Sequence, residues 1–173
     1  DLGFDDSGFA LPELRLRRHI VRADWSQDAG EDQGQLRLLR RPDNSATAIH
    51  REKRLTVEAR VRVVADLVAA EASEPWIVWC DTDYEADALT AAITDALEVR
   101  GSMDADTKEA RLTAFSTGAA RVLVTKPSIA GFGLNWQHCA RMAFVGLSFS
   151  YESFYQAVRR CWRFGQERAV HAH

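Results

Sequence analysis

Several features of secreted, metal-binding or membrane proteins are missing from this sequence. Its three cysteines, Cys80, Cys139 and Cys161, are odd in number and lie far apart without a CxxC pair. Neither a disulfide framework nor a structural zinc site is therefore predicted. No apolar run approaches the roughly 20 residues that cross a bilayer, and the first residues are acidic rather than basic and then apolar. We expect a cytoplasmic protein that does not contact the membrane.

The overall charge is also small. A net charge of -3 gives no global attraction to nucleic acid, but the basic residues are mostly arginine and are clustered. The three clusters are Arg15, Arg17, Arg18 and Arg22; Arg37, Arg40 and Arg41; and Arg159, Arg160, Arg163 and Arg168. Exposure to solvent accounts for the first two clusters. In the third, Arg159, Arg160 and Arg163 fall on a predicted helix. With 173 residues, 46% of them hydrophobic, the chain fits one globular domain with an appendage. Because it starts at Asp1, we expect a piece cut from a longer protein.

The first 54 residues differ in pattern from the rest. Short apolar groups are interrupted by Gly, Pro and Asp, and QDAGEDQGQ at 27–35 is typical of an exposed loop. The run LRLRRHIV at 14–21 has the even apolar spacing of a strand. We assign residues 1–54 to a connector from a preceding domain and residues 55–173 to the globular domain.

From residue 55 onward, helical patterns alternate with short apolar runs. Strands are predicted at 76–80, 121–125 and 141–146, with another ending at residue 101 and a last one beginning at 170. Helices are predicted at 57–72, with Thr56 as N-cap, and at 85–97, 104–115 and 151–163. This alternation predicts an α/β fold in which helices flank a parallel sheet on both faces.

Two segments that follow predicted strands are suited to binding phosphate. In TKPSIAGFGLNWQ, at 125–137, the run AGFG lets backbone amides approach a phosphate or ribose, although a glycine-rich turn alone is a weak signal. In YQAVRRCWRFGQ, at 155–166, Gln156, Arg160 and Arg163 are four and three residues apart, so a helix would place all three on one side. Guanidinium groups keep their charge and bind phosphate in a bidentate manner, so this face is predicted to meet an anion.

Taken together, the two segments resemble motifs V and VI of superfamily 2 helicases, in the Snf-type branch that includes chromatin remodellers and their bacterial and phage relatives. WIVWCDTDYEADAL, at 76–89, is similar to the motif IV strand and its helix, and the resemblance extends from about residue 55 to 166. It implies the C-terminal RecA-like domain of a bacterial or phage helicase. The implied activity is that of the second motor domain of an ATP-dependent translocase on double-stranded DNA.

The resemblance also implies roles for individual residues. Arg160 and Arg163 match the arginine fingers of motif VI, which reach the γ-phosphate of ATP bound by the first domain. Further nucleotide contacts fall on Gly131, Gly133, Asn135 and Gln156. Contacts to nucleic-acid phosphates, which carry no base information, fall on Ser102, Thr125, Lys126 and Ser128. The sequence departs from the family pattern at Gly146, where an acid is frequent, and at Arg159 and Trp162.

One half of an ATPase site is missing from the sequence. It has neither a GxxxxGK[ST] loop nor a strand ending in an Asp-Glu pair, so nothing in it cradles the β- and γ-phosphates or holds Mg²⁺. We expect ATP and Mg²⁺ to be bound mainly by a first RecA-like domain of the same parent chain. This chain alone is then expected to be inactive.

Two other interpretations remain open. One is a non-catalytic module that docks nucleic acid or protein, and the other is a Rossmann domain with GFG as a shortened fingerprint, which lies late in the sheet. Among individual side chains, Trp136 is a candidate for stacking on a base, and His171 with His173 for a metal site that lacks a third ligand. Trp76 and Trp79 are predicted to pack on opposite faces of their strand, and His138 to be structural.

Overall fold

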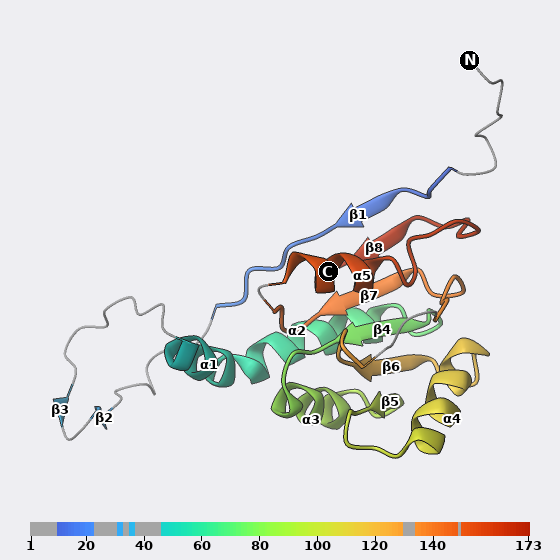
Figure 1. Ribbon diagram of the computed structural model, residues 1–173. Helices are drawn as coiled ribbons and strands as arrows, with labels where there is room; N and C mark the ends of the chain where they lie inside the picture. Colours follow the sequence, from blue (N-terminus) through green and yellow to red (C-terminus); the bar gives the residue numbers. More distant parts are fainter. Residues whose placement is uncertain (1–9, 23–30, 33–34, 37–45, 130–133, 149) are drawn as a thin grey trace.

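A parallel sheet with helices on both sides forms the body of the molecule (Figure 1). The computed structural model describes residues 10–22, 31–32, 35–36, 46–129, 134–148 and 150–173. Six strands pair in the order β1-β8-β7-β4-β6-β5, and every neighbouring pair is parallel. They are β1 (Leu14–Leu16), β4 (Trp76–Trp79), β5 (Ala96–Val99), β6 (Val122–Thr125), β7 (Arg141–Phe144) and β8 (Val170–Ala172). The predicted α/β fold is confirmed.

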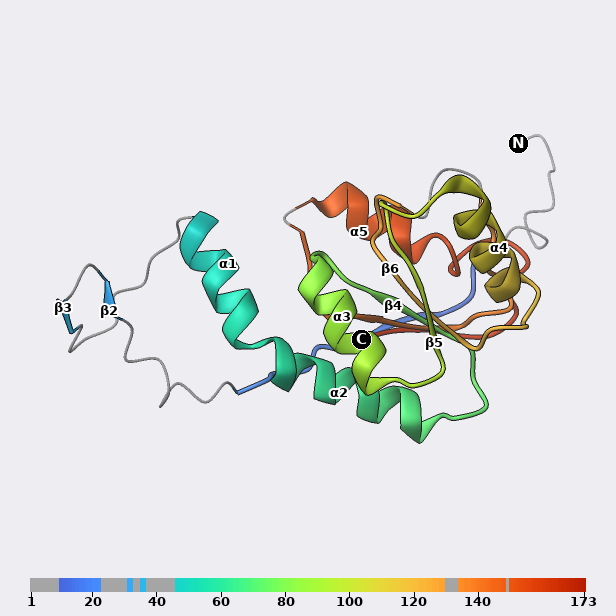
Figure 2. The same ribbon diagram turned by 90° about the horizontal axis from the view of Figure 1, so that it is seen from below.

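The helices form the two outer layers, as Figure 2 shows with the sheet seen nearly edge-on. Helices α2 (Val57–Ala70) and α3 (Asp83–Ala92) pack on one face, whereas α4 (Ala105–Ser116) and α5 (Tyr151–Val158) pack on the other. The helix α1 (Ala46–Leu55) leads directly into α2. A short antiparallel pair, β2 (Glu31–Asp32) and β3 (Gln35–Leu36), completes the described elements.

The central strands are buried on both faces, which explains their uninterrupted apolar sequence. Along β4, Trp76 and Val78 join the core under α2 and α3, while Ile77 and Trp79 join the core under α4 and α5. All four side chains are fully buried. The prediction that Trp76 and Trp79 pack on opposite faces is therefore confirmed.

The N-terminal segment contributes a strand to this sheet. Strand β1 lies in register with β8, with Leu14 opposite Val170, and forms the outer edge of the sheet. The helix α1 was not predicted, and its presence changes the role of Thr56. This hydroxyl donates to the carbonyl of Glu52 at 2.8 Å instead of capping α2, because the chain is already helical before it.

Candidate functional site

The six strands of the main sheet are parallel, so their carboxyl ends, where open sheets bind ligands, lie at one edge. Segments that follow β4, β6 and β7 meet there and, with the start of α5, enclose a cavity of about 160 Å³. Its lining includes Asp81, Lys126, Ser128, Gly146 and Ser153. Two of the four residues predicted to contact nucleic-acid phosphates thus line one cavity.

The four predicted phosphate-contacting residues differ in their surroundings. Ser102 and Ser128 are exposed on the turns after β5 and β6. Lys126 pairs with Asp83 at 2.9 Å, and this contact lowers the pKa of the Asp83 carboxyl. Thr125, in contrast, is buried and its hydroxyl donates to the carbonyl of Val99 at 3.0 Å. That hydroxyl is used inside the fold and is not offered to a ligand.

The predicted helix at 151–163 is shorter in the structure. Helix α5 ends at Val158, and the amides of Arg160 and Cys161 then bond to carbonyls only three residues back. The carbonyl of Arg160 accepts from the amide of Trp136 at 3.0 Å, so the motif V segment holds this turn. The prediction that Gln156, Arg160 and Arg163 share a single helix is therefore wrong, although the two arginines still lie just after its last turn.

The guanidinium groups of Arg160 and Arg163 lie close enough to influence each other. Burial and the charge of Arg163 both lower the pKa of Arg160. The side chain of Arg160 donates to the carbonyl of Leu134 at 3.3 Å. Among the described residues, no carboxylate pairs with either arginine. Two neighbouring positive charges thus have no counter-ion in the part of the chain that the structure describes.

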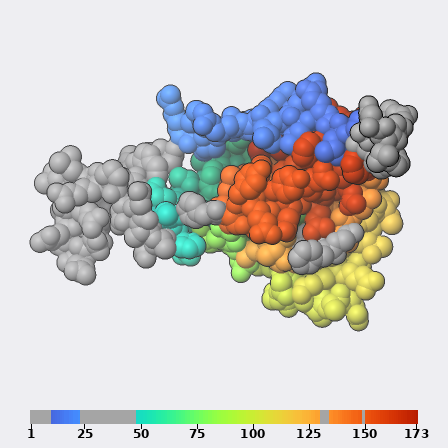
Figure 3. Space-filling model, turned by 45° about the horizontal axis from the view of Figure 1, so that its top comes forward, coloured from blue at the N-terminus to red at the C-terminus, as the bar shows by residue number. Residues whose placement is uncertain are grey.

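These arginines belong to a face of the molecule that several distant segments build. Figure 3 shows α5 and the residues after it in orange-red, between the N-terminal segment in blue and α4 in yellow. Asn135 is exposed in the segment before this turn, and Gln156 is exposed on α5, where its amide donates to Glu152 at 3.0 Å. Gly131 and Gly133, the other predicted nucleotide contacts, lie outside the described residues.

The deviations from the motif VI pattern have structural counterparts. The guanidinium of Arg159 lies 5.5 Å from the Trp162 ring centre, a cation-π contact. The indole N–H of Trp162 donates to the carbonyl of Pro12 at 2.7 Å. This turn is therefore attached to the N-terminal segment that leads into β1.

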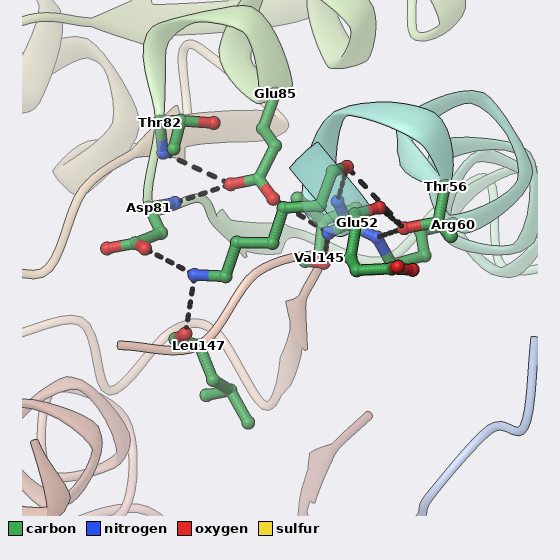
Figure 4. Close-up of polar contacts among 9 residues, drawn as sticks. Glu52, Thr56, Arg60, Asp81, Thr82, Glu85, Val145 and Leu147 are labelled. Atoms are coloured by element: carbon green, nitrogen blue, oxygen red, sulfur yellow. Dashed lines mark hydrogen bonds and ion pairs between the residues drawn. The ribbon is translucent and has the colours of Figure 1, made fainter. Parts of the chain in front are cut away.

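Sequence reasoning missed a buried ion pair near the same edge, shown in Figure 4. Glu85 is fully buried, and its carboxylate accepts from Arg60 at 2.7 Å and from the amides of Asp81 and Thr82 at 2.9 and 3.1 Å. A Cβ at Gly146 would stand 2.4 Å from one of its oxygens. The pattern Thr82-x-x-Glu85 is a capping-box signature and could have revealed part of this site.

The remaining candidates are structural. Trp136 is fully buried and its indole N–H donates to Ser116 at 2.9 Å, so the suggested stacking on a base is wrong. Burial raises the pKa of the Cys80 thiol to about 12, which keeps it neutral. Among the described residues, which include His171 and His173, no group of three or more potential ligands is placed to hold a metal ion.

Within the same residues, no helix has the length and apolar character needed to cross a membrane.

Comparisons with known proteins agree with this fold. Residues 59–165 match the family model described as helicase conserved C-terminal domain. The curated relative ATP-dependent RNA helicase eIF4A of Yarrowia lipolytica (strain CLIB 122 / E 150) is 27% identical over 112 residues, which are 62% of this chain and 28% of that protein. The chain thus spans under a third of the length of this relative.

Solved structures give the same fold. The C-terminal part of the Fun30 ATPase domain has a TM-score of 0.57 at 16% identity and covers 66% of this chain and 40% of its own. The C-terminal domain of the DEAD-box protein Dbp5 has a TM-score of 0.56 at 15% identity, covering 65% of this chain and 68% of its own. Together with the sheet order, the family match over more than half of its length shows that the chain belongs to the helicase conserved C-terminal domain family.

Proposed function

We propose that this chain is the second motor domain of a Snf-type, ATP-dependent translocase of bacterial or phage origin that moves on double-stranded DNA. In this proposal Arg160 and Arg163 face ATP held with Mg²⁺ by a first RecA-like domain. The observation that supports it most directly is the pair of neighbouring guanidinium groups without a carboxylate partner among the described residues. Such a pair fits the outer phosphates of a nucleotide, because a ligand that is itself negative removes their repulsion.

The contributions of this chain follow from its own groups. Bound ATP supplies the phosphoryl group whose transfer to water releases the free energy for movement. Arg160 and Arg163 stabilise the negative charge that develops on that group. The bond from Arg160 to the Leu134 carbonyl connects the arginines to the motif V segment. Lys126, Ser102 and Ser128 lie after neighbouring strands, where they offer a cation and two hydroxyls to a phosphate backbone.

The test is the ATPase activity of a complete protein that contains this chain and a first RecA-like domain. Arg160→Ala and Arg163→Ala are each expected to lower kcat by about 10³-fold or more, because both arginines act on the transferred group. Arg168→Ala is the matched control, since this arginine belongs to the same cluster but already pairs with Glu74 at 2.7 Å. Its kcat should stay within about threefold of the unchanged protein.

An unchanged kcat in both arginine variants would overturn the motor proposal and favour a docking module. The polymer is tested separately by comparing duplex DNA, single-stranded DNA and RNA as activators of the same ATPase. We expect duplex DNA to stimulate turnover most, with activation falling as salt is raised, because contacts to phosphates are weakened by salt. Stronger activation by RNA would contradict the assignment to double-stranded DNA.

A further inference from the structure

Two basic residues connect the helices α1 and α2 to the carboxyl ends of β4 and β7. The inner one, Arg60 of α2, donates to the Glu85 carboxylate, to the carbonyl of Val145 and, at 2.5 Å, to the carbonyl of Lys53. Its Nε also donates to the Thr56 hydroxyl at 3.1 Å. Four separate acceptors therefore surround one guanidinium group, as Figure 4 shows.

The outer one, Lys53 of α1, has fewer contacts, but these contacts join the segments that follow two strands. Its ammonium group donates to the Asp81 carboxylate at 2.5 Å and to the carbonyl of Leu147 at 2.9 Å. Asp81 follows β4 and Leu147 follows β7, so a single side chain joins two neighbouring strand ends. Only 17% of the Lys53 side chain is exposed, which strengthens both contacts relative to a surface ion pair.

The segment that Lys53 holds is a wall of the candidate site. Gly146, Leu147 and Ser148 line the 160 Å³ cavity opposite Lys126 and Ser128. The same segment leads to Ser150, whose hydroxyl caps α5 by accepting from the amide of Ser153 at 3.1 Å. Residues 146–148 therefore form part of the cavity wall, and the Ser148 hydroxyl connects this segment to the start of α5 by accepting from the amide of Ser150 at 3.5 Å.

Helix α1 lies outside the stretch that matches the family model, which begins at residue 59. Among the described side chains of this helix, none is buried, so α1 adds little to the core. The ammonium group of Lys53 nevertheless reaches the Asp81 carboxylate and the Leu147 carbonyl at the strand ends. The contact instead links α1 mechanically to the site.

We propose that Lys53 is a positioning residue: through Asp81 and the Leu147 carbonyl, it sets residues 146–148 and thereby the arginine-bearing segment after α5. Helix α1, at the junction of the predicted connector and the globular domain, then transmits its position to ATP hydrolysis. This inference rests on the proposed motor function for its effect on turnover, but its structural part does not.

The structural part is tested on this chain by amide hydrogen exchange in Lys53→Met, Lys53→Arg and Arg54→Met. We expect Lys53→Met to speed exchange of the Val145 amide, which donates to the Trp79 carbonyl at 3.0 Å just before residues 146–148, and of the Ser153 and Phe154 amides in the first turn of α5. The expected change is about tenfold, the effect of losing one hydrogen bond to a charged group. Exchange in β5 and β6 should not change. Lys53→Arg should restore most of the protection, because it keeps a cationic donor.

Arg54→Met is the matched control, because it removes the same charge from the adjacent position, where Arg54 lies 5.2 Å from the Tyr84 ring centre. It should leave exchange of the Val145, Ser153 and Phe154 amides unchanged. Unchanged protection in Lys53→Met would overturn the proposal. So would an even loss of protection in all strands, which would mean that Lys53 only stabilises the whole fold.

The functional part uses the ATPase of the complete protein. Lys53→Met should lower kcat about tenfold with little change in the KM for ATP, because the first domain holds the nucleotide. A normal kcat together with faster local exchange would overturn the link to hydrolysis. Failure of the motor proposal itself is distinguishable, since it would leave kcat unchanged in Arg160→Ala and Arg163→Ala and would not affect the exchange result.

Discussion

Two arginine sites of the molecule have opposite surroundings. Arg60 donates to a buried carboxylate, two carbonyls and a hydroxyl, so its charge is balanced inside the fold. Arg160 reaches one carbonyl and lies under the influence of Arg163, another positive charge. Burial disfavours the charged form of Arg160, and the positive charge of Arg163 disfavours it further.

This difference separates an arginine whose charge is balanced inside the fold from two arginines that, in the proposed function, meet the phosphates of a ligand. A charge taken from water is expensive unless it is paired, so two partly buried guanidinium groups that repel each other and have no carboxylate partner among the described residues do not stabilise the fold. The sequence pattern does not distinguish the two cases, because Arg60 also lies on a helix with an apolar stripe. Their acceptors do.

The largest expected effect on stability comes from removing the balanced arginine. Arg60→Met should lower the free energy of unfolding by about 3 to 5 kcal/mol, because the Glu85 carboxylate stays buried without its ion-pair partner. Urea denaturation followed by circular dichroism measures this. Adding Glu85→Leu to the variant should recover part of the loss, since it removes the unpaired charge. A loss below about 1 kcal/mol would place Arg60 with ordinary surface ion pairs.

An intermediate effect is expected where the backbone approaches this ion pair. Gly146→Ala should cost about 1 to 3 kcal/mol, because the new Cβ would lie 2.4 to 2.8 Å from the Glu85 carboxyl group, which Arg60 and two amides hold in place. Gly101→Ala is the control, since a Cβ there meets only Ile129 at an ordinary 3.8 Å. Equal unfolding midpoints for the two variants would show that the carboxylate can move aside.

The smallest effect is expected at the unbalanced arginines. Arg163→Gln should change the free energy of unfolding by no more than about 0.5 kcal/mol, because no carboxylate among the described residues loses a partner. Removing the neighbouring charge should also bring the pKa of Arg160 back toward its usual range. The same urea titration checks the stability. A loss comparable to that of Arg60→Met would refute the contrast between the two sites.

Local patterns predicted most of the sheet because each depends on neighbouring residues. The apolar runs WIVW and VLVT become strands buried on both faces, and the helical spacing of Val61, Val64 and Val68 becomes the buried stripe of α2. The motif V and VI segments also fall where they were predicted, after β6 and around the end of α5. Prediction failed where a contact with a residue far away in the sequence decides the position of a side chain. Trp136 is an example, because its amide donates to the carbonyl of Arg160 and its ring is buried in the core.

By itself, the sequence determined the alternating strands and helices, because periodicity and residue type act over a few positions, and it marked two segments as candidates for binding phosphate. Only the tertiary structure decided which charges are balanced. Arg60 lies 25 residues from Glu85 and 85 residues from Val145, and Thr125 uses its hydroxyl on a strand 26 residues away. These pairs form only when folding brings the strand ends together at one edge of the sheet, so a pattern of neighbouring residues does not predict them.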